Sequence, residues 1–436
     1  MVIYRKSLYK KMWNLSYPLM LANLSVVLLN FIDIKMVGVL GKDAVAAVGI
    51  SLSLIWLLQV PILESFMDNA VIIFTRYSTM NSWNKLAQVF FQECKIAFLL
   101  GIATWLFLIP FYYICDIMAE NATIASMAFS YCLIIILGFP ICAIGAIGMR
   151  LLLALNMNKV MSAFSICSVV VNILLDYLLI FGECGFPKMG VSGAALGTMI
   201  AKMFENLGFF FVALRFILAN RTVKKRAEKR IYKEILHSGT TLFTASLVES
   251  LAWSCFTFNI SKLGTIALAA QETVMRLKDI SYVPSTAICN VAASVVGQER
   301  GKNNVESARC SGISCMHLSI MITSIFSTTF LIFADQLVGF LISDIEVIKA
   351  GANLLRFIAL YQLIDVVYTI FKGCLRGVGD LEFIKKNTVF FSWVIWIPLS
   401  LIFIYICGFG LIGAWVSLGI FSLSLAIRYS HRFMNI

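Results

Sequence analysis

The chain has 436 residues, of which 60% are hydrophobic and only 13% are charged, and its mean hydropathy is +0.89. This composition excludes a soluble globular domain, because a water-exposed surface needs many more charged side chains. The formal net charge of +12 is typical of a membrane protein with basic cytoplasmic loops and does not by itself indicate nucleic-acid binding. The twelve cysteines form no C-x-x-C pair, so we expect buried thiols rather than a disulfide or metal framework.

Twelve stretches of the sequence are long and apolar enough to cross a membrane, which takes about 20 mostly apolar residues. The pattern predicts an all-α polytopic membrane protein with spans at residues 15–39, 44–75, 87–113, 123–153, 160–182, 189–217, 237–261, 266–297, 309–334, 350–376, 384–407 and 411–430. Pro61 and Pro284 are expected to bend the second and eighth spans, because proline removes a helical hydrogen bond.

The turn after the first span recurs in the second half of the chain. Leu40-Gly41 with its following alanines returns 223 positions later as Leu263-Gly264 with alanines at the same spacing, and Val60-Pro61 returns as Val283-Pro284. An internal repeat of this kind fixes the architecture. Each copy holds six spans, an even number, so both copies enter the membrane in the same direction. We therefore predict two six-helix bundles, residues 1–218 and 237–436, joined by a basic linker at 219–236 and related by an axis along the membrane normal.

Basic residues gather in every second link between the predicted spans. The longest such cluster is the linker, which contains Arg221, Lys224, Lys225, Arg226, Lys229, Arg230 and Lys233. Links on the other side carry acids such as Asp116 and Glu120. The positive-inside rule then predicts a multi-pass protein of a bacterial-type cytoplasmic membrane with both termini in the cytoplasm. We interpret the linker as a solvated loop and expect no nucleic-acid partner.

Acidic side chains inside the spans of the first half are candidates for function, because buried charges in a membrane are costly. Asp33 and Asp176 lie about 27 Å and 24 Å along helices that both start at the cytoplasmic face. Asn172 is one turn before Asp176 and shares its face. The three side chains form a candidate proton site, and the two acids are candidates for binding a cationic substrate. The alternative is that one acid pairs with Lys35 or Lys202.

Glu249 and Asp365 are expected nearer the midplane of the second bundle. Carboxylates with neighbouring hydroxyl and carbonyl groups suit a hard cation, so these two acids are candidate Na⁺ ligands. Other ionisable residues in the spans are weaker candidates. Glu64, Asp68 and Glu205 suit hydrogen bonds between the two bundles as well as they suit binding a ligand. Arg276, Lys278 and Asp279 are expected either to neutralise one another or to act in a cavity.

These residues resemble the motifs of a known family, the multidrug and toxic compound extrusion (MATE) transporters. The segment from Asp33 through residues 38–49 resembles the family's first-helix signature. The segments at 172–177 (NILLDY) and 190–195 (GVSGAA) are similar to its passage from the fifth to the sixth helix. The second half adds matching segments at 263–271, 296–298 and 365–377, so the resemblance covers nearly the whole chain.

The resemblance implies a functional monomer in the lipid bilayer that exports small organic compounds, often cationic, in exchange for H⁺ or Na⁺, without a cofactor. It places Asp33, Asn172 and Asp176 at proton-coupling positions. It places Glu249 and Asp365 at acids that sodium-coupled bacterial members use. Lys35, beside the key acid, departs from the family's pattern.

Two other functions remain as alternatives. A flippase for a lipid-linked precursor would need a markedly cationic cavity, whereas these spans carry more acids than bases. A membrane enzyme would need a catalytic constellation near one face. The three histidines, His237, His317 and His431, are scattered and form no such group, so we expect no enzyme.

Overall fold

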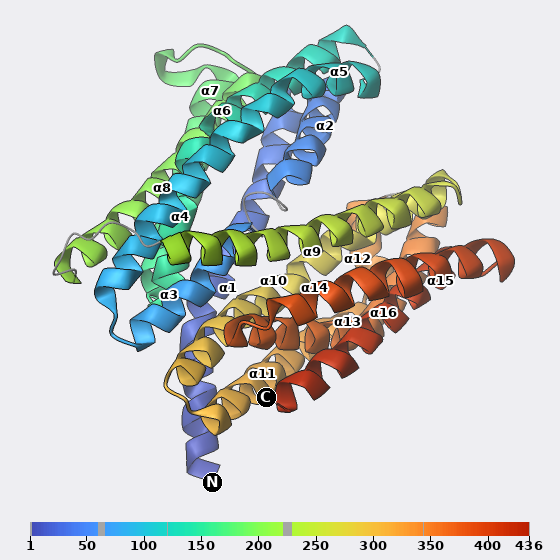
Figure 1. Ribbon diagram of the computed structural model, residues 1–436. Helices are drawn as coiled ribbons and strands as arrows, with labels where there is room; N and C mark the ends of the chain where they lie inside the picture. Colours follow the sequence, from blue (N-terminus) through green and yellow to red (C-terminus); the bar gives the residue numbers. More distant parts are fainter. Residues whose placement is uncertain (1, 60–65, 120, 221–228, 343, 436) are drawn as a thin grey trace. The chain divides into compact units, whose positions relative to one another are not determined.

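The computed structural model describes residues 2–59, 66–119, 121–220, 229–342 and 344–435. These residues are almost entirely helical, and no strand occurs among them (Figure 1). The first half contains α1 (Val2–Gly38), α2 (Lys42–Leu58), α3 (Asn69–Thr79), α4 (Trp83–Ala103), α5 (Leu108–Met118), α6 (Ala122–Ala154), α7 (Asn158–Phe181) and α8 (Val191–Asn220), with short turns η2 (Thr104–Phe107) and η3 (Glu183–Gly185). The second half contains α9 (Lys229–Ser261), α10 (Thr265–Gly301), α11 (Val305–Ile332), α12 (Ala334–Leu341), α13 (Ile345–Val378), α14 (Leu381–Phe390), α15 (Ile397–Leu401) and α16 (Gly410–Met434), with π-helical turns η4 (Phe391–Trp396) and η5 (Ile402–Ile406).

The helices correspond to the twelve predicted spans. In the described part of the chain, eight helical stretches have the length and apolar composition to cross a membrane. Three further helices, α1, α8 and α9, have 30 residues or more, which is long enough to span. The remaining span corresponds to α2 and α3. Pro61 lies outside the described residues between them, whereas Pro284 lies inside the continuous helix α10.

The two halves of the predicted repeat share an unusual backbone conformation at one glycine each. Gly41 precedes α2 with φ 109° and ψ 173°, and Gly264 precedes α10 with φ 109° and ψ 169°. Side chains with a Cβ atom rarely adopt this positive φ, so glycine is required at both positions. The two glycines, 223 positions apart in the sequence, thus begin helices with the same unusual backbone conformation.

By packing, the chain forms two compact units. The first unit comprises Leu21–Phe243, and the second unit comprises Met1–Met20 together with Thr244–Ile436. The divisions therefore fall inside the long helices α1 and α9. The boundaries expected from the sequence, 1–218 and 237–436 with a linker at 219–236, stay a prediction, since residues 221–228 lie outside the described part.

Close helix contacts at glycine hold each unit together. In the first unit α6 packs on α8, where a Cβ on Gly145 would lie 2.3 Å from Cβ of Asn206. In the second unit α13 packs on α10, where a Cβ on Gly377 would lie 2.4 Å from the carbonyl oxygen of Ala293. Gly373 lies one turn earlier and faces Cys289 in the same way. Small residues one turn apart allow helix backbones to approach closely inside a membrane.

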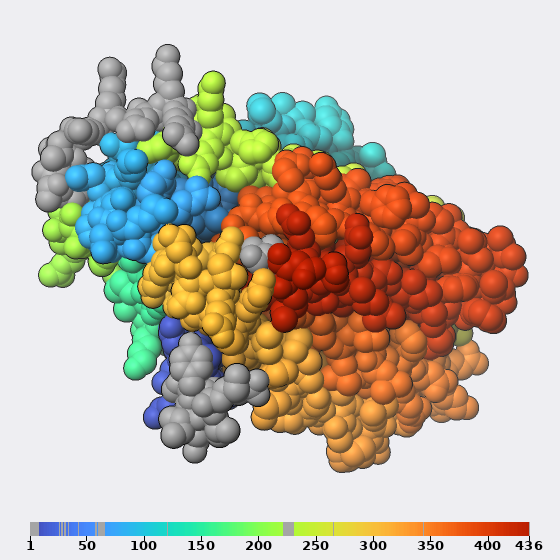
Figure 2. All heavy atoms as spheres, turned by 60° about the horizontal axis from the view of Figure 1, so that its bottom comes forward, coloured from blue at the N-terminus to red at the C-terminus, as the bar shows by residue number. Residues whose placement is uncertain are grey.

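In the second unit, three helix ends lie on one face. The Gly312 position near the start of α11 contacts the ring of Phe433 at the end of α16. The guanidinium of Arg432 binds Asp380, in the turn between α13 and α14, at 2.8 Å. The α10–α11 turn (gold) and the end of α16 (dark red) are visible together on this face (Figure 2). The links after the eighth and tenth spans therefore lie on the same side of the unit as the C-terminal helix end.

Candidate functional site

The predicted proton site is assembled in the first unit. Asp176 and Asn172 lie four residues apart on α7, and both side chains are fully buried. Asp33 of α1 and the Asn172 amide both lie close to the Asp176 carboxyl group. The structure thus brings together all three residues that the sequence singled out for this site.

A glycine on α8 makes room for the acid pair. A Cβ on Gly197 would lie 2.2 Å from Oδ1 of Asp176, so any larger residue would displace the carboxylate. The phenol of Tyr131, from α6, is close enough to interact electrostatically with both acids. The site is therefore built from α1, α6, α7 and α8.

The acids of this site have buried oxygens with no partner. Both carboxylate oxygens of Asp176 and Oδ1 of Asp33 are buried without a hydrogen bond, as are both amide atoms of Asn172. Two ionised carboxylates side by side repel one another, and neither can donate a hydrogen bond. One proton held between them would remove the repulsion and supply the missing donor. The arrangement can therefore bind a proton.

The lysines considered as partners do not form an ion pair with these acids in the described part of the chain. Lys35 is exposed. Lys202 lies near enough to Asp33 for a through-space interaction, although no Lys202 ion pair is seen among the described residues.

The weaker acidic candidates have partners of their own where they are described. Oε1 of Glu205 accepts a hydrogen bond from Ser165. Asp68 pairs with Arg150 at 3.2 Å. Glu64 lies outside the described residues.

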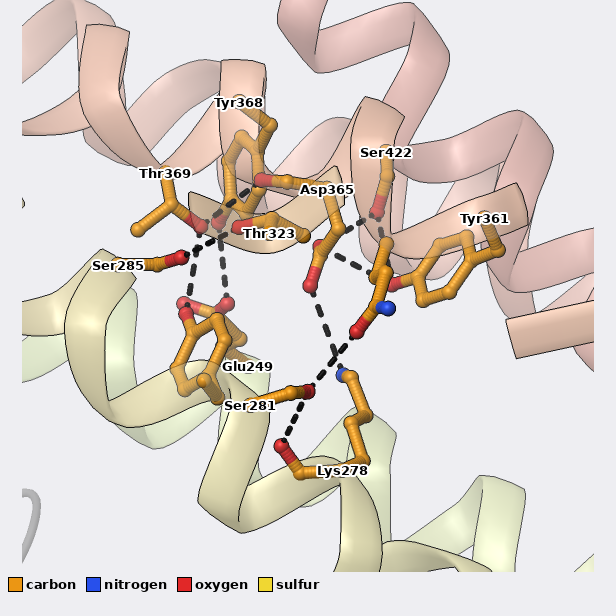
Figure 3. A network of polar contacts seen from close by, with 12 residues as sticks. Glu249, Lys278, Ser281, Ser285, Thr323, Tyr361, Asp365, Tyr368, Thr369 and Ser422 are labelled. Atoms are coloured by element: carbon orange, nitrogen blue, oxygen red, sulfur yellow. Dashed lines mark hydrogen bonds and ion pairs between the residues drawn. The ribbon is translucent and has the colours of Figure 1, made fainter. Parts of the chain in front are cut away.

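In the second unit, Asp365 of α13 lies in a polar network (Figure 3). Its Oδ1 accepts hydrogen bonds from the hydroxyl groups of Tyr361, at 3.0 Å, and Ser422, at 3.1 Å. Its Oδ2 lies 3.5 Å from the Nζ of Lys278, on α10. Lys278 therefore reaches across to the neighbouring helix, and it also lies close enough to Asp279 for an electrostatic interaction, as does Arg276. Both expectations for these three residues, mutual neutralisation and a role in a cavity, stay predictions.

Glu249 of α9 lies in the same network. It pairs with Nζ of Lys372 at 2.8 Å and accepts a hydrogen bond from the hydroxyl of Tyr368 at 3.2 Å. Lys372 also binds the Tyr368 hydroxyl at 3.0 Å. Each of the two candidate Na⁺ ligands therefore already faces a lysine ammonium group. No group of three acidic, histidine or cysteine side chains that could hold a metal occurs among the described residues. The Na⁺ assignment stays a prediction.

Sequence reasoning missed Lys372, Tyr361 and Tyr368. A signal was present, because residues 361, 365, 368 and 372 follow the 4, 3, 4 spacing of one helix face. Polar side chains in such a stripe inside an apolar helix indicate a buried network. This spacing could not show which residues of α9, α10 and α16 contact the stripe.

The comparison with known sequences gives the family. The sequence model of the MatE family matches residues 18–178 and again residues 241–402. The chain belongs to the MATE family of transporters. The two matched segments begin 223 positions apart, which is the spacing of the repeat found in the sequence. The predicted family is confirmed.

Relatives of similar length extend this result. Proteins described as "Probable multidrug resistance protein NorM" from Bacillus cereus and Burkholderia mallei are 23% and 24% identical to this chain. The match to the Bacillus protein covers 93% of this chain and 90% of that protein. The match to the Burkholderia protein covers 96% of this chain and 91% of that protein. The chain is accordingly a multi-pass membrane protein of this transporter family, and it is similar over nearly its whole length to proteins named for multidrug resistance.

Solved structures share the fold. An outward-facing multidrug resistance MATE transporter matches with a TM-score of 0.86 at 20% identity, over 98% of this chain and 96% of that one. A transporter of the MOP superfamily from Pyrococcus furiosus matches with a TM-score of 0.88 at 20% identity, over 98% and 95%. The predicted fold of twelve membrane helices in two repeated bundles is confirmed.

Proposed function

We propose that the protein is an antiporter that exports organic, amphipathic cations across the cell membrane in exchange for protons. The observation that carries this proposal is the pairing of Asp33 with the fully buried Asp176, in which Oδ1 of Asp33 and both carboxylate oxygens of Asp176 lack hydrogen-bond partners. A site of this kind can hold either a proton or the positive charge of a cargo molecule. The multidrug resistance names of the relatives support organic compounds as cargo.

Exchange requires that the proton and the cargo compete for the same acids. A bound ligand shifts a conformational equilibrium only if it binds the two states with different affinity. When protonated, Asp33 and Asp176 lose their attraction for a cationic compound. When ionised, they regain it. Alternate opening to the two sides of the membrane then converts proton entry into cargo exit.

Sodium was the second candidate for the coupling ion, through Glu249 and Asp365. Each of these acids lies within 3.5 Å of a lysine ammonium nitrogen. A second positive charge at either acid would be repelled by that lysine. This pairing favours H⁺ over Na⁺ as the coupling ion.

The alternative of a lipid-precursor flippase gains no support from the charges. The two lysines of the network in the second unit are paired with acids, so they do not form a free cationic surface for a phosphate group. The names of the relatives do not favour a flippase either. We also place both chain termini in the cytoplasm and regard the functional unit as a monomer.

Transport in proteoliposomes tests the proposal. Vesicles containing the protein and loaded with ethidium are exposed either to a pH gradient or to a Na⁺ gradient at constant pH. We expect the pH gradient alone to drive ethidium movement, and protein-free vesicles to show none. Movement driven only by Na⁺ would contradict the proton assignment. Movement that neither gradient affects would contradict antiport itself.

A further inference from the structure

The ammonium group of Lys278 lies in a cage of three aromatic rings and one carboxylate. Its Nζ is 5.4 Å from the ring centroid of Tyr282, 5.4 Å from that of Tyr361 and 5.9 Å from that of Trp415. The carboxylate of Asp365 is 3.5 Å away. Aromatic faces combined with an acid are the chemistry that binding sites use for organic ammonium ions.

Contacts that do not involve Lys278 hold the other groups of the cage in place. Tyr361 and Ser422 both donate hydrogen bonds to Oδ1 of Asp365, and their hydroxyl oxygens lie 3.1 Å apart. These contacts fix the carboxylate while leaving Oδ2 directed toward Lys278 (Figure 3). Trp415, from α16, is fully buried. A cation receptor made from α10, α13 and α16 would therefore persist if the lysine side chain were shortened.

The cage is also well shielded from water. Side-chain exposure is 12% for Lys278 and 9% for Asp365. The other ion pair of the network, Lys372–Glu249, has only one such ring: Nζ of Lys372 lies 5.3 Å from the ring centroid of Tyr368. Its side chains are 27% and 32% exposed. Of the two pairs, Lys278 is thus the more enclosed and has more rings around it.

We propose that Lys278 is a tethered cation that fills a cation-binding cage formed by Asp365, Tyr282, Tyr361 and Trp415. A group attached to the chain acts at a high effective concentration, so a free cation competes poorly with it. Lys278 thereby excludes Na⁺ and cationic cargo from the second unit and leaves the acids of the first unit as the site of exchange. The cage itself rests only on contacts in the second unit; its consequence for transport rests on the proposed function.

Chemical rescue tests the cage directly and needs no transport. Lys278→Ala removes three methylene groups and the amine, which is the volume of n-propylammonium. The melting temperature of the purified full-length protein is measured in detergent with n-propylammonium, Na⁺ or the bulky N-methylglucamine cation at constant ionic strength. We expect n-propylammonium or Na⁺ to raise the melting temperature of Lys278→Ala by roughly 3 °C or more relative to N-methylglucamine. A rise with the amine alone identifies an organic-ammonium cage, and a rise with Na⁺ alone identifies an inorganic cation site.

Three control variants separate this effect from general salt stabilisation. Lys302→Ala removes a lysine whose side chain is 57% exposed and paired with Glu299, so it should show no rescue. Lys278→Arg keeps a charge in the cage and should show none. The double variant Lys278→Ala/Asp365→Asn lacks the acid and should lose the rescue.

Several results would overturn the proposal. One is the absence of rescue by either cation in Lys278→Ala. Another is a rescue that persists in the double variant. A third is Asp365-dependent binding of ²²Na⁺ to the wild-type protein, which would show that the lysine does not close the site. If Lys278→Ala cannot be purified without added cation, Lys278→Met, which keeps the bulk of the side chain, is assayed for ²²Na⁺ and ¹⁴C-methylammonium binding. Failure of this variant to bind either would be equally decisive against the cage.

Discussion

At the scale of single residues, the unpartnered oxygens of Asp33 and Asp176 are the feature on which the proposed exchange depends. Leaving a buried carboxylate oxygen without a hydrogen bond costs free energy in most proteins. At a site that releases one ligand and binds another, unpaired oxygens remain available for the incoming ligand. The acids of the second unit differ, because Asp365 and Glu249 are both held by a tyrosine hydroxyl and a lysine.

Replacing Asp33 by asparagine should abolish exchange. The amide keeps the shape of the side chain, but it is uncharged and takes up no proton at neutral pH. Ethidium movement driven by a pH gradient should fall to the level of empty vesicles. Asp335→Asn is the matched control, because this acid forms an exposed pair with Arg356. Equal transport by Asp33→Asn and the wild type would rule out Asp33 as a coupling residue.

Gly197 offers a test of the geometry without removing a charge. In Gly197→Ala the new Cβ would lie 2.2 Å from Oδ1 of Asp176 and would force the carboxylate to move. We expect strongly reduced pH-driven transport from a protein that is still produced and folded. Gly49→Ala is the control, since no heavy atom lies within 4 Å of the added carbon. Normal transport by Gly197→Ala would show that the position of Asp176 is not critical.

At the scale of helices, the tight contact between α10 and α13 positions the whole network of the second unit. Glycines at 373 and 377 allow α13 to approach the backbone of α10. Lys278 and Tyr282 are thereby brought opposite Asp365 and Tyr361. The stability of the unit should accordingly depend on these glycines.

Gly377→Ala should lower the melting temperature of the protein. The added carbon would lie 2.4 Å from the carbonyl oxygen of Ala293, and a backbone atom cannot move aside as a side chain can. Overpacking of this kind typically costs about 1–3 kcal/mol. Gly419→Ala, whose nearest heavy atom would be 3.7 Å away, should melt like the wild type. A melting temperature unchanged by Gly377→Ala would show that the contact is looser than described.

The helices themselves could be predicted from the sequence, because apolar length alone determines which segments can cross a membrane. The turn glycines could also be predicted, since Gly41 and Gly264 occupy equivalent places in the repeat. The π-helical turns within 391–406 could not, because their apolar residues read as ordinary helix. The lysine–acid pairs were missed for another reason: they join helices that are distant in the chain, and a single sequence does not show which faces meet.

At the scale of the whole molecule, the proposed cytoplasmic position of the C-terminus rests on where helix ends and basic residues lie in the second unit. Arg300 and Lys302 follow α10, and Lys385 and Lys386 lie in α14, just after the tenth span. Contacts place the starts of α11 and α14 on the same side of the second unit as the end of α16. Basic residues favour the cytoplasmic side.

Reporter fusions at the two ends of the chain test this topology. We expect a cytoplasm-active reporter to be active, and a periplasm-active reporter to be silent, when fused before Met1 or after Ile436. A fusion in the link between the ninth and tenth spans, near Asp344, should give the opposite pattern. A C-terminal reporter that is active only outside the cytoplasm would contradict the twelve-span topology.

The proposed exchange requires that a cationic compound and a proton compete for Asp33 and Asp176. Proton release on binding measures this competition directly. Tetraphenylphosphonium is added to the purified protein in weakly buffered detergent solution, and the released protons are followed with a pH indicator. We expect the wild type to release protons whether or not Na⁺ is present, and Asp176→Asn to release none. Binding of the cation by the wild type without proton release, or with release that survives in Asp176→Asn, would contradict it.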